Sequence, residues 1–137
     1  MSEKLHLNKT FSTNFSFSQQ DVTDFARVTG DNNPVHLDEE FASKTIFKTR
    51  IMHGMLGACV FSKVFGTLFP GEGTIYLSQS VNFLKPMYVD VIYEAHFEVM
   101  EILEKNRARI STTILTNEGK KVVVGDAVIM NIEKIDV

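Results

Sequence analysis

The sequence has little of several features that would point to particular classes of protein. Its 137 residues include one cysteine, Cys59, so no disulfide can form within the chain, as is usual in a reducing cytoplasm. Its 14 Lys and Arg residues are mixed along the chain with 17 Asp and Glu residues, without a basic tract or an acidic tail. We therefore expect a cytoplasmic protein with no nucleic-acid partner.

Several catalytic and binding motifs are missing as well. The sequence has no Gly-x-Ser-x-Gly nucleophile elbow, no Cys/His cluster with zinc spacing and no phosphate-binding glycine loop. Residues 1–9 are too polar for a secretory signal peptide. The most apolar stretch, residues 51–69, contains His53, Ser62, Lys63 and three glycines, which favours a buried helix over a membrane span. We therefore expect neither a metal site nor a membrane association.

The chain length and composition are those of one globular domain. A chain of this size with 44% hydrophobic residues can bury a core, and no repeat or linker divides it, so we expect a single domain over residues 1–137.

A helix is predicted to begin after Ser18, where Asp21 can complete a capping box, and to end at Gly30. A loop over residues 31–36 is predicted to follow, because Pro34 disfavours a helix before it.

The rest of the chain predicts one apolar helix and an antiparallel sheet. Residues 54–65 are apolar on nearly every side of a helical wheel, so this helix should be enclosed, with Cys59 as a small core residue. Strand-like alternation occurs over residues 5–11, 75–83, 91–99, 108–114 and 122–132, with a turn at 117–119. An α+β fold follows, with a curved antiparallel sheet wrapped around a long central apolar helix; this is the hotdog fold.

Asp31 and His36 are the first candidates for chemistry. The turn between them can bring a carboxylate and an imidazole to one point, which is the minimum that paired acid/base catalysis requires. The same residues are typical of a purely structural turn, in which Asp31 and Asn32 bond to nearby backbone. On these residues alone, the structural interpretation is the favoured one.

His53, Gly54 and Ser62 are the second group of candidates. Gly54 lets a ligand approach the backbone, and the N–H groups at the start of the predicted helix would suit an oxyanion. Equally, Gly54 can be a close-packing glycine and His53 a hydrogen-bonded core histidine. Ser62, one of the few polar residues on this helix, can contact Asp31 or the substrate, or bond back to the carbonyl of Ala58.

Four segments resemble the MaoC-like, (R)-specific enoyl-CoA hydratase family. They are FARVTGDNNPVH (Phe25–His36), IMHGML (Ile51–Leu56), PGEGTIYLSQSVNF (Pro70–Phe83) and VGDAV (Val124–Val128). The first is the most specific, because it resembles the family's hydratase motif, in which Asp and His are paired across Asn-Pro. It therefore reverses the interpretation of Asp31 and His36 as a mere turn. One departure is Asp90-Val91, where relatives usually have Gly-Asp, and it puts the local turn geometry in question.

The resemblance implies reversible addition of water to a trans-2-enoyl-CoA to give an (R)-3-hydroxyacyl-CoA. Asp31 would act as base on water, His36 would hold that water and deliver a proton to C2, and the Gly54 N–H would polarise the thioester carbonyl. Asn33, His53 and Ser62 are possible supporting residues. The resemblance further implies a homodimer and a reaction without cofactor, with coenzyme A as part of the substrate.

Three alternatives remain open at this level. A hotdog acyl-CoA thioesterase would place a carboxylate beside the same helix start. A non-catalytic acyl-thioester-binding module would use the pocket without turnover. A dehydratase of the same family would act on thioesters of acyl carrier protein.

Overall fold

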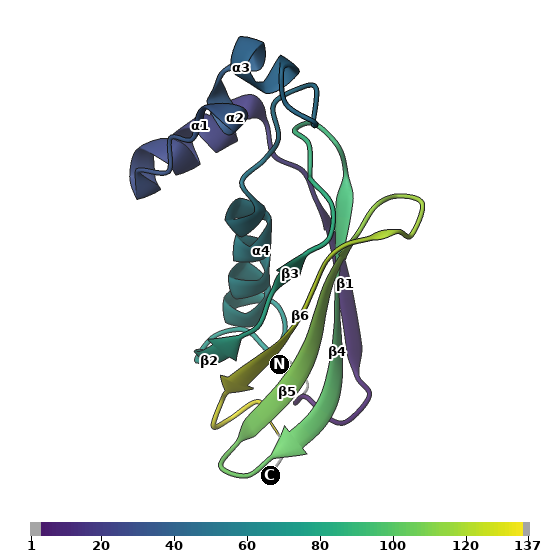
Figure 1. Ribbon diagram of the computed structural model, residues 1–137. Helices are drawn as coiled ribbons and strands as arrows, with labels where there is room; N and C mark the ends of the chain where they lie inside the picture. Colours follow the sequence, from purple (N-terminus) through teal and green to yellow (C-terminus); the bar gives the residue numbers. More distant parts are fainter. Residues whose placement is uncertain (1–3, 136–137) are drawn as a thin grey trace.

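The computed structural model describes residues 4–135, so residues 1–3 and 136–137 of the predicted domain lie outside the described part. In chain order the elements are β1 (Thr10–Phe15), α1 (Gln19–Thr29), α2 (Pro34–Leu37), α3 (Glu39–Ser43), α4 (Gly54–Thr67), β2 (Ile75–Gln79), β3 (Asn82–Phe83), β4 (Tyr93–Leu103), β5 (Arg107–Leu115) and β6 (Lys121–Met130). Figure 1 shows α4 alongside a curved sheet, with α1, α2 and α3 grouped beyond its N-terminal end. This arrangement is the predicted hotdog fold.

The sheet is antiparallel and has the strand order β1-β4-β5-β6-β2, with β3 also paired to β6. Alternate residues of β4 and β5 are buried, as the period-two pattern predicted. Phe97 of β4 is fully buried and its ring packs against Phe61 and Phe65 of α4 at centroid distances of 5.7 and 5.4 Å. The core therefore forms where the apolar face of the sheet meets one face of the central helix.

The capping signals around α1 are confirmed. The Ser18 side chain accepts a hydrogen bond from the Asp21 N–H, the Asp21 carboxylate accepts one from the Ser18 N–H, and Gly30 adopts a left-handed φ of 81°. The loop predicted for residues 31–36 is wrong in its second half, because α2 begins at Pro34. The N–H of the first helical residue has no partner within the helix, so a proline, which lacks this N–H, fits that position. Pro34 therefore begins α2 although it disfavours a helix before it.

Two strand predictions need correction. The first strand was expected over residues 5–11, but the chain turns at Asn8, which has a φ of 71°, and β1 begins only at Thr10. The segment 75–83 was expected to be one strand. It forms β2 and β3 instead, which pair with β6 on either side of Ser80 and Val81, and β2 itself has a register shift on β6 between Tyr76 and Ser78.

Helix α4 is only half enclosed. Its buried face consists of Leu56, Gly57, Ala58, Val60, Phe61, Val64 and Phe65. Met55 is 57% exposed and Cys59 is also exposed, so the predictions of a fully enclosed helix and of a core cysteine are wrong for this chain by itself. The sheet wraps around one side of the helix and does not reach the strip that carries these two residues. No helix in the described residues is both long enough and apolar enough to cross a membrane.

Asp90, the departure from the family pattern, lies in a tight turn before β4. Its φ is 61°, a conformation that glycine adopts freely and that aspartate tolerates better than most residues. Its N–H donates to the carbonyl of Phe17 at 2.8 Å, which ties this turn to the segment before α1. The turn is thus formed without the glycine.

Candidate active site

His36 is held in place by the backbone that enters α4. It lies in the single turn of α2 and is 9% exposed. Its Nδ1 is 2.8 Å from the carbonyl oxygen of Ile51. Because a carbonyl can only accept, Nδ1 carries the hydrogen, and the lone pair of a neutral ring is then on Nε2. The ring is thereby fixed with a proton acceptor free to meet a ligand.

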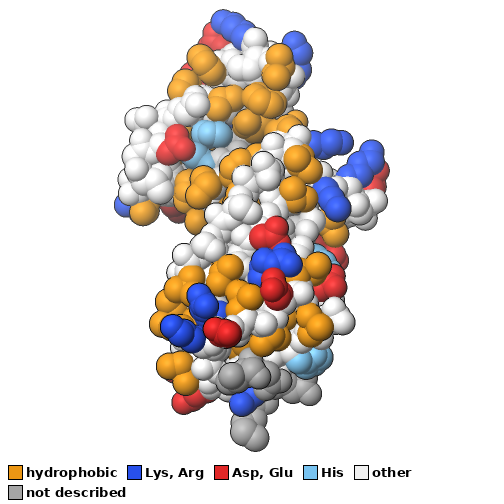
Figure 2. Space-filling model, turned by 60° about the horizontal axis from the view of Figure 1, so that its bottom comes forward, with side chains coloured by type: hydrophobic (Ala, Val, Ile, Leu, Met, Phe, Trp, Pro, Cys, Tyr) orange, Lys and Arg blue, Asp and Glu red, His pale blue; other side chains and the backbone are white. Residues whose placement is uncertain are grey.

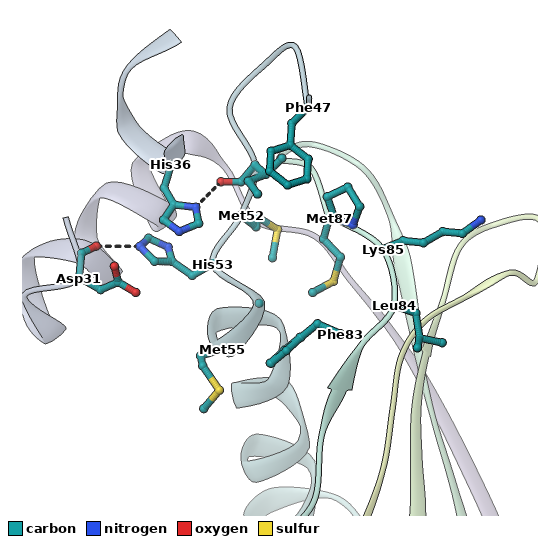
Figure 3. A pocket seen from close by; sticks show the side chains of 13 residues that line it. Asp31, His36, Phe47, Met52, His53, Met55, Phe83, Leu84, Lys85 and Met87 are labelled. Carbon is teal, nitrogen blue, oxygen red and sulfur yellow. Dashed lines mark hydrogen bonds between the residues drawn. The ribbon is translucent and has the colours of Figure 1, made fainter. Parts of the chain in front are cut away.

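His53 fixes the position of Asp31. The His53 Nε2 donates to the backbone carbonyl of Asp31 at 2.9 Å, so the Asp31 side chain stays free. The His53 ring is 2% exposed and lies between His36 and Phe25, at centroid distances of 3.9 and 4.9 Å. One ligand-type atom from each of Asp31, His36 and His53 lies within 4.8 Å of the others. The structure therefore brings the predicted pair together and adds His53 to it (Figure 3).

The environment of His36 favours its neutral form. Burial lowers the pKa of His36 below its ordinary value, against the effect of the Ile51 carbonyl, which raises this pKa. The neighbouring His53 ring lowers the pKa of His36 further, and the Asp31 carboxylate raises it. The result is an imidazole that starts unprotonated at neutral pH.

Gly54 is both a close-packing glycine and the first residue of α4. A Cβ at this position would lie 2.7 Å from the Phe83 ring, so a larger residue would displace that ring. The first amides that bond into the helix are those of Leu56 and Gly57, which donate to the carbonyl of His53. The N–H groups of Gly54 and Met55 have no acceptor within residues 4–135, and they lie at the positive end of the helix dipole.

Asp31, His36, His53 and Gly54 line one cavity of about 390 Å³. The other lining residues are mainly apolar, and the sequence did not mark them as site residues: Phe47, Ile51, Met52, Met55, Phe83, Leu84, Lys85, Pro86 and Met87. They come from the loop before α4, from the first turn of α4, and from the end of β3 with the segment after it, which only the tertiary fold brings together (Figure 3). On the molecular surface, Figure 2 shows histidine next to an acidic side chain and bordered by hydrophobic side chains.

The two remaining candidates are placed differently. Asn33 is the N-cap of α2, where its side-chain oxygen accepts a hydrogen bond from the Val35 N–H at 3.2 Å. Ser62 is exposed and lines a second cavity of about 290 Å³ with Cys59 and Tyr76, and neither hydrogen bond expected for it forms among the described residues. Met55 lines both cavities, so Ser62 is a neighbour of the site and not part of its polar centre.

The chain also resembles known proteins in sequence. Residues 3–132 match the family model described as a MaoC like domain. A 3-hydroxybutyryl-CoA dehydratase of Methylorubrum extorquens is 40% identical over 96% of this chain and 83% of the relative. An (R)-specific enoyl-CoA hydratase of Aeromonas caviae is 42% identical over 82% of this chain and 85% of the relative.

Solved structures show the same fold. The (R)-hydratase from A. caviae involved in PHA biosynthesis superposes with a TM-score of 0.89 at 38% identity, covering 93% of this chain and 97% of that one. An unliganded R-hydratase from Pseudomonas aeruginosa gives a TM-score of 0.88 at 42% identity, covering 93% and 82%. The match over nearly the whole chain, in sequence and in structure, shows that this protein belongs to the MaoC-like domain family.

Proposed function

We propose that this protein catalyses the reversible addition of water to trans-2-enoyl-CoA, giving (R)-3-hydroxyacyl-CoA. The observation that carries the proposal is the meeting of Asp31 and His36 in one cavity with the free N–H of Gly54. The names of relatives at 38–42% identity, (R)-specific enoyl-CoA hydratase and 3-hydroxybutyryl-CoA dehydratase, support the same reaction.

The separation of the acid/base groups suits one water molecule. Two acceptors up to 4.8 Å apart can each take a hydrogen bond of about 2.8 Å from the same water. Asp31 accepts a proton as the water oxygen attacks C3. Because His36 starts neutral, it can deliver a proton to C2 only after receiving one, so the proton passes from Asp31 through His36 Nε2 to C2. Water thus supplies both the hydroxyl and the added hydrogen.

The start of α4 stabilises the charge that this addition creates. Attack at C3 moves negative charge onto the thioester oxygen, and the Gly54 N–H can donate to it at the positive end of the helix. The thioester itself activates the alkene, so we propose that the reaction needs no metal and no redox cofactor. Coenzyme A is then part of the substrate.

The other polar residues support this centre. His53 holds the Asp31 backbone, and Asn33 caps the helix that carries His36, so both act as positioning residues. An acyl chain that passes Met55 would enter the second cavity and reach Ser62.

We further propose a homodimer. The edge strand β2 is mostly exposed, with Ile75 at 49% and Leu77 at 46%, and it lies next to the exposed strip of α4. An apolar edge strand beside an open helix face is a surface that a second copy can cover. The lone cysteine and the acyl-CoA substrate fit a cytoplasmic location.

Crotonyl-CoA separates the proposed reaction from two alternatives. A hydratase removes the enoyl absorbance without releasing free thiol, whereas a thioesterase releases thiol. A non-catalytic binding module does neither, and its ligand binding would survive both Asp31→Asn and His36→Gln. Thiol release without loss of the alkene would exclude the proposal.

A second candidate function is dehydration of 3-hydroxyacyl thioesters on acyl carrier protein. It is favoured by a tomato relative, 33% identical over 84% of this chain, that is named a mitochondrial 3-hydroxyacyl-[acyl-carrier-protein] dehydratase. The same four-carbon group presented on coenzyme A and on acyl carrier protein would show which carrier gives the higher kcat/KM.

A further inference from the structure

The polar centre of the cavity has the ligands of a transition-metal site. Asp31, His36 and His53 each place one oxygen or nitrogen within 4.8 Å of the other two. Three such protein ligands with an open fourth position are typical of accessible zinc sites. Both imidazoles belong to the cavity lining.

Each histidine already has one ring nitrogen fixed by a backbone carbonyl. One nitrogen of each ring donates to a backbone carbonyl: His36 Nδ1 to Ile51, and His53 Nε2 to Asp31. Metal-binding histidines are usually fixed by such a bond from the second nitrogen. The nitrogens that remain are His36 Nε2 and His53 Nδ1, which an ion could take without breaking either bond.

His53 Nδ1 is an independent sign of a missing partner. This atom is buried and has no hydrogen-bond partner among residues 4–135, in a residue that is 2% exposed. A buried lone pair without a partner loses the hydrogen bonds that water gave it in the unfolded chain. A cation that accepted this lone pair would remove that cost.

The donor set selects the kind of ion. Two imidazole nitrogens and one carboxylate suit Zn²⁺, whereas Mg²⁺ and Ca²⁺ prefer oxygen ligands. Zinc ligands about 2.0–2.2 Å from the ion stand roughly 3.3–3.6 Å apart in a tetrahedral site. Groups that now lie up to 4.8 Å apart would therefore close by about an ångström. The two imidazole rings, whose centroids lie 3.9 Å apart with planes at 31°, would turn so that their lone pairs meet at the ion.

We propose that Asp31, His36 and His53 bind one Zn²⁺ ion per chain and that this ion inhibits the enzyme. The ion would occupy the carboxylate and the Nε2 lone pair through which the proton has to pass. The inhibition rests on the proposed hydratase function, whereas the binding does not.

Calorimetric titration of the whole protein with zinc sulfate tests the binding without any substrate. We expect one equivalent per chain, and no comparable binding of magnesium. Asp31→Asn, His36→Gln and His53→Gln should each weaken zinc binding by at least about tenfold, the scale of loss seen when even a supporting group is removed from a metal site. Circular dichroism of each variant checks that it is folded.

Three matched controls replace the cysteine and the two histidines that lie outside the proposed site. Cys59→Ser, His6→Gln and His96→Gln each remove such a group outside the cavity and should leave the titration unchanged. Absence of binding, or binding that only these controls weaken, would overturn the proposal. If zinc binds through the three residues but crotonyl-CoA is not hydrated, the site stands and the proposed function fails.

Discussion

The sheet core and the catalytic cavity bury their side chains in different ways. Between the sheet and α4 the contacts are apolar, and Phe97 alone packs against the rings of Phe11, Phe61, Phe65 and Phe69. At the N-terminal end of α4, two imidazoles are buried, and each is fixed by one bond to a backbone carbonyl. Stability should therefore depend mainly on the first region and activity on the second, and replacements in each region can separate the two.

The largest effect is expected at the acid/base pair. Asp31→Asn and His36→Gln should each lower kcat/KM for crotonyl-CoA by about 10²–10⁴, the usual contribution of a positioned acid or base. Unfolding of Asp31→Asn should change little, because Asp31 is exposed and its backbone carbonyl, not its side chain, bonds to His53. Steady-state kinetics and thermal unfolding of the same samples check this. Full activity in either variant would contradict the assignment.

In the core, the opposite result is expected. Phe97→Ala removes a fully buried ring and should lower the free energy of unfolding by about 3–5 kcal/mol, while the folded fraction keeps its kcat. Phe41→Ala, at a position 47% exposed, is the matched control and should cost less than about 0.5 kcal/mol. Urea denaturation measures both. An equal cost at the two positions would mean that the core does not dominate stability.

His53 connects the two regions, and its replacement should affect both stability and activity. His53→Leu leaves the Asp31 carbonyl without its donor and should cost about 1–3 kcal/mol of stability together with part of the activity. His53→Gln keeps a donor and should recover part of both losses. The decisive readout is the split between kcat and KM, since a displaced Asp31 lowers kcat more than it raises KM. Identical behaviour of the two variants would mean that His53 contributes through packing and not through its hydrogen bond to Asp31.

The smallest effect is the pH dependence contributed by His36. Because burial lowers its pKa in the folded protein, the unfolded chain binds more protons at mildly acidic pH. The part of the free energy of unfolding that this shift contributes should therefore be fully present above the ordinary histidine pKa of about 6.5. It should be lost as the pH falls below about 6.5 and through the lower pKa of His36 in the folded protein. His36→Gln should flatten this part of the profile. Urea denaturation between neutral and mildly acidic pH measures the difference, and an unchanged slope would contradict it.

The same contrast explains what could be predicted from the sequence. The period-two pattern of β4 and β5 and the Ser18 capping box are local signals, and both predicted the structure correctly. The exposure of Cys59 could not be predicted, because helical periodicity does not tell how far a sheet wraps around a helix. Phe47 and Lys85 line the cavity only because distant segments meet there, so no local pattern marks them.

The site was predicted through its motif and not through its contacts. Asp31 and His36 were identified by their spacing and their resemblance to the family. The two backbone carbonyls that orient His36 and His53 belong to residues 51 and 31, and carbonyls carry no sequence signal. The starting protonation of His36, and the path of the proton that follows from it, therefore required the structure.

Hydration of crotonyl-CoA in heavy water, followed by chiral and mass analysis of the product, tests the central claim most directly. Attack at C3 by a water held on Asp31 and delivery of the proton to C2 by His36, each from a fixed position, predict (R)-3-hydroxybutyryl-CoA with a single deuterium on one face of C2. A product of mixed configuration at C3, or deuterium on both faces of C2, would contradict proton transfer through a fixed Asp31–His36 pair.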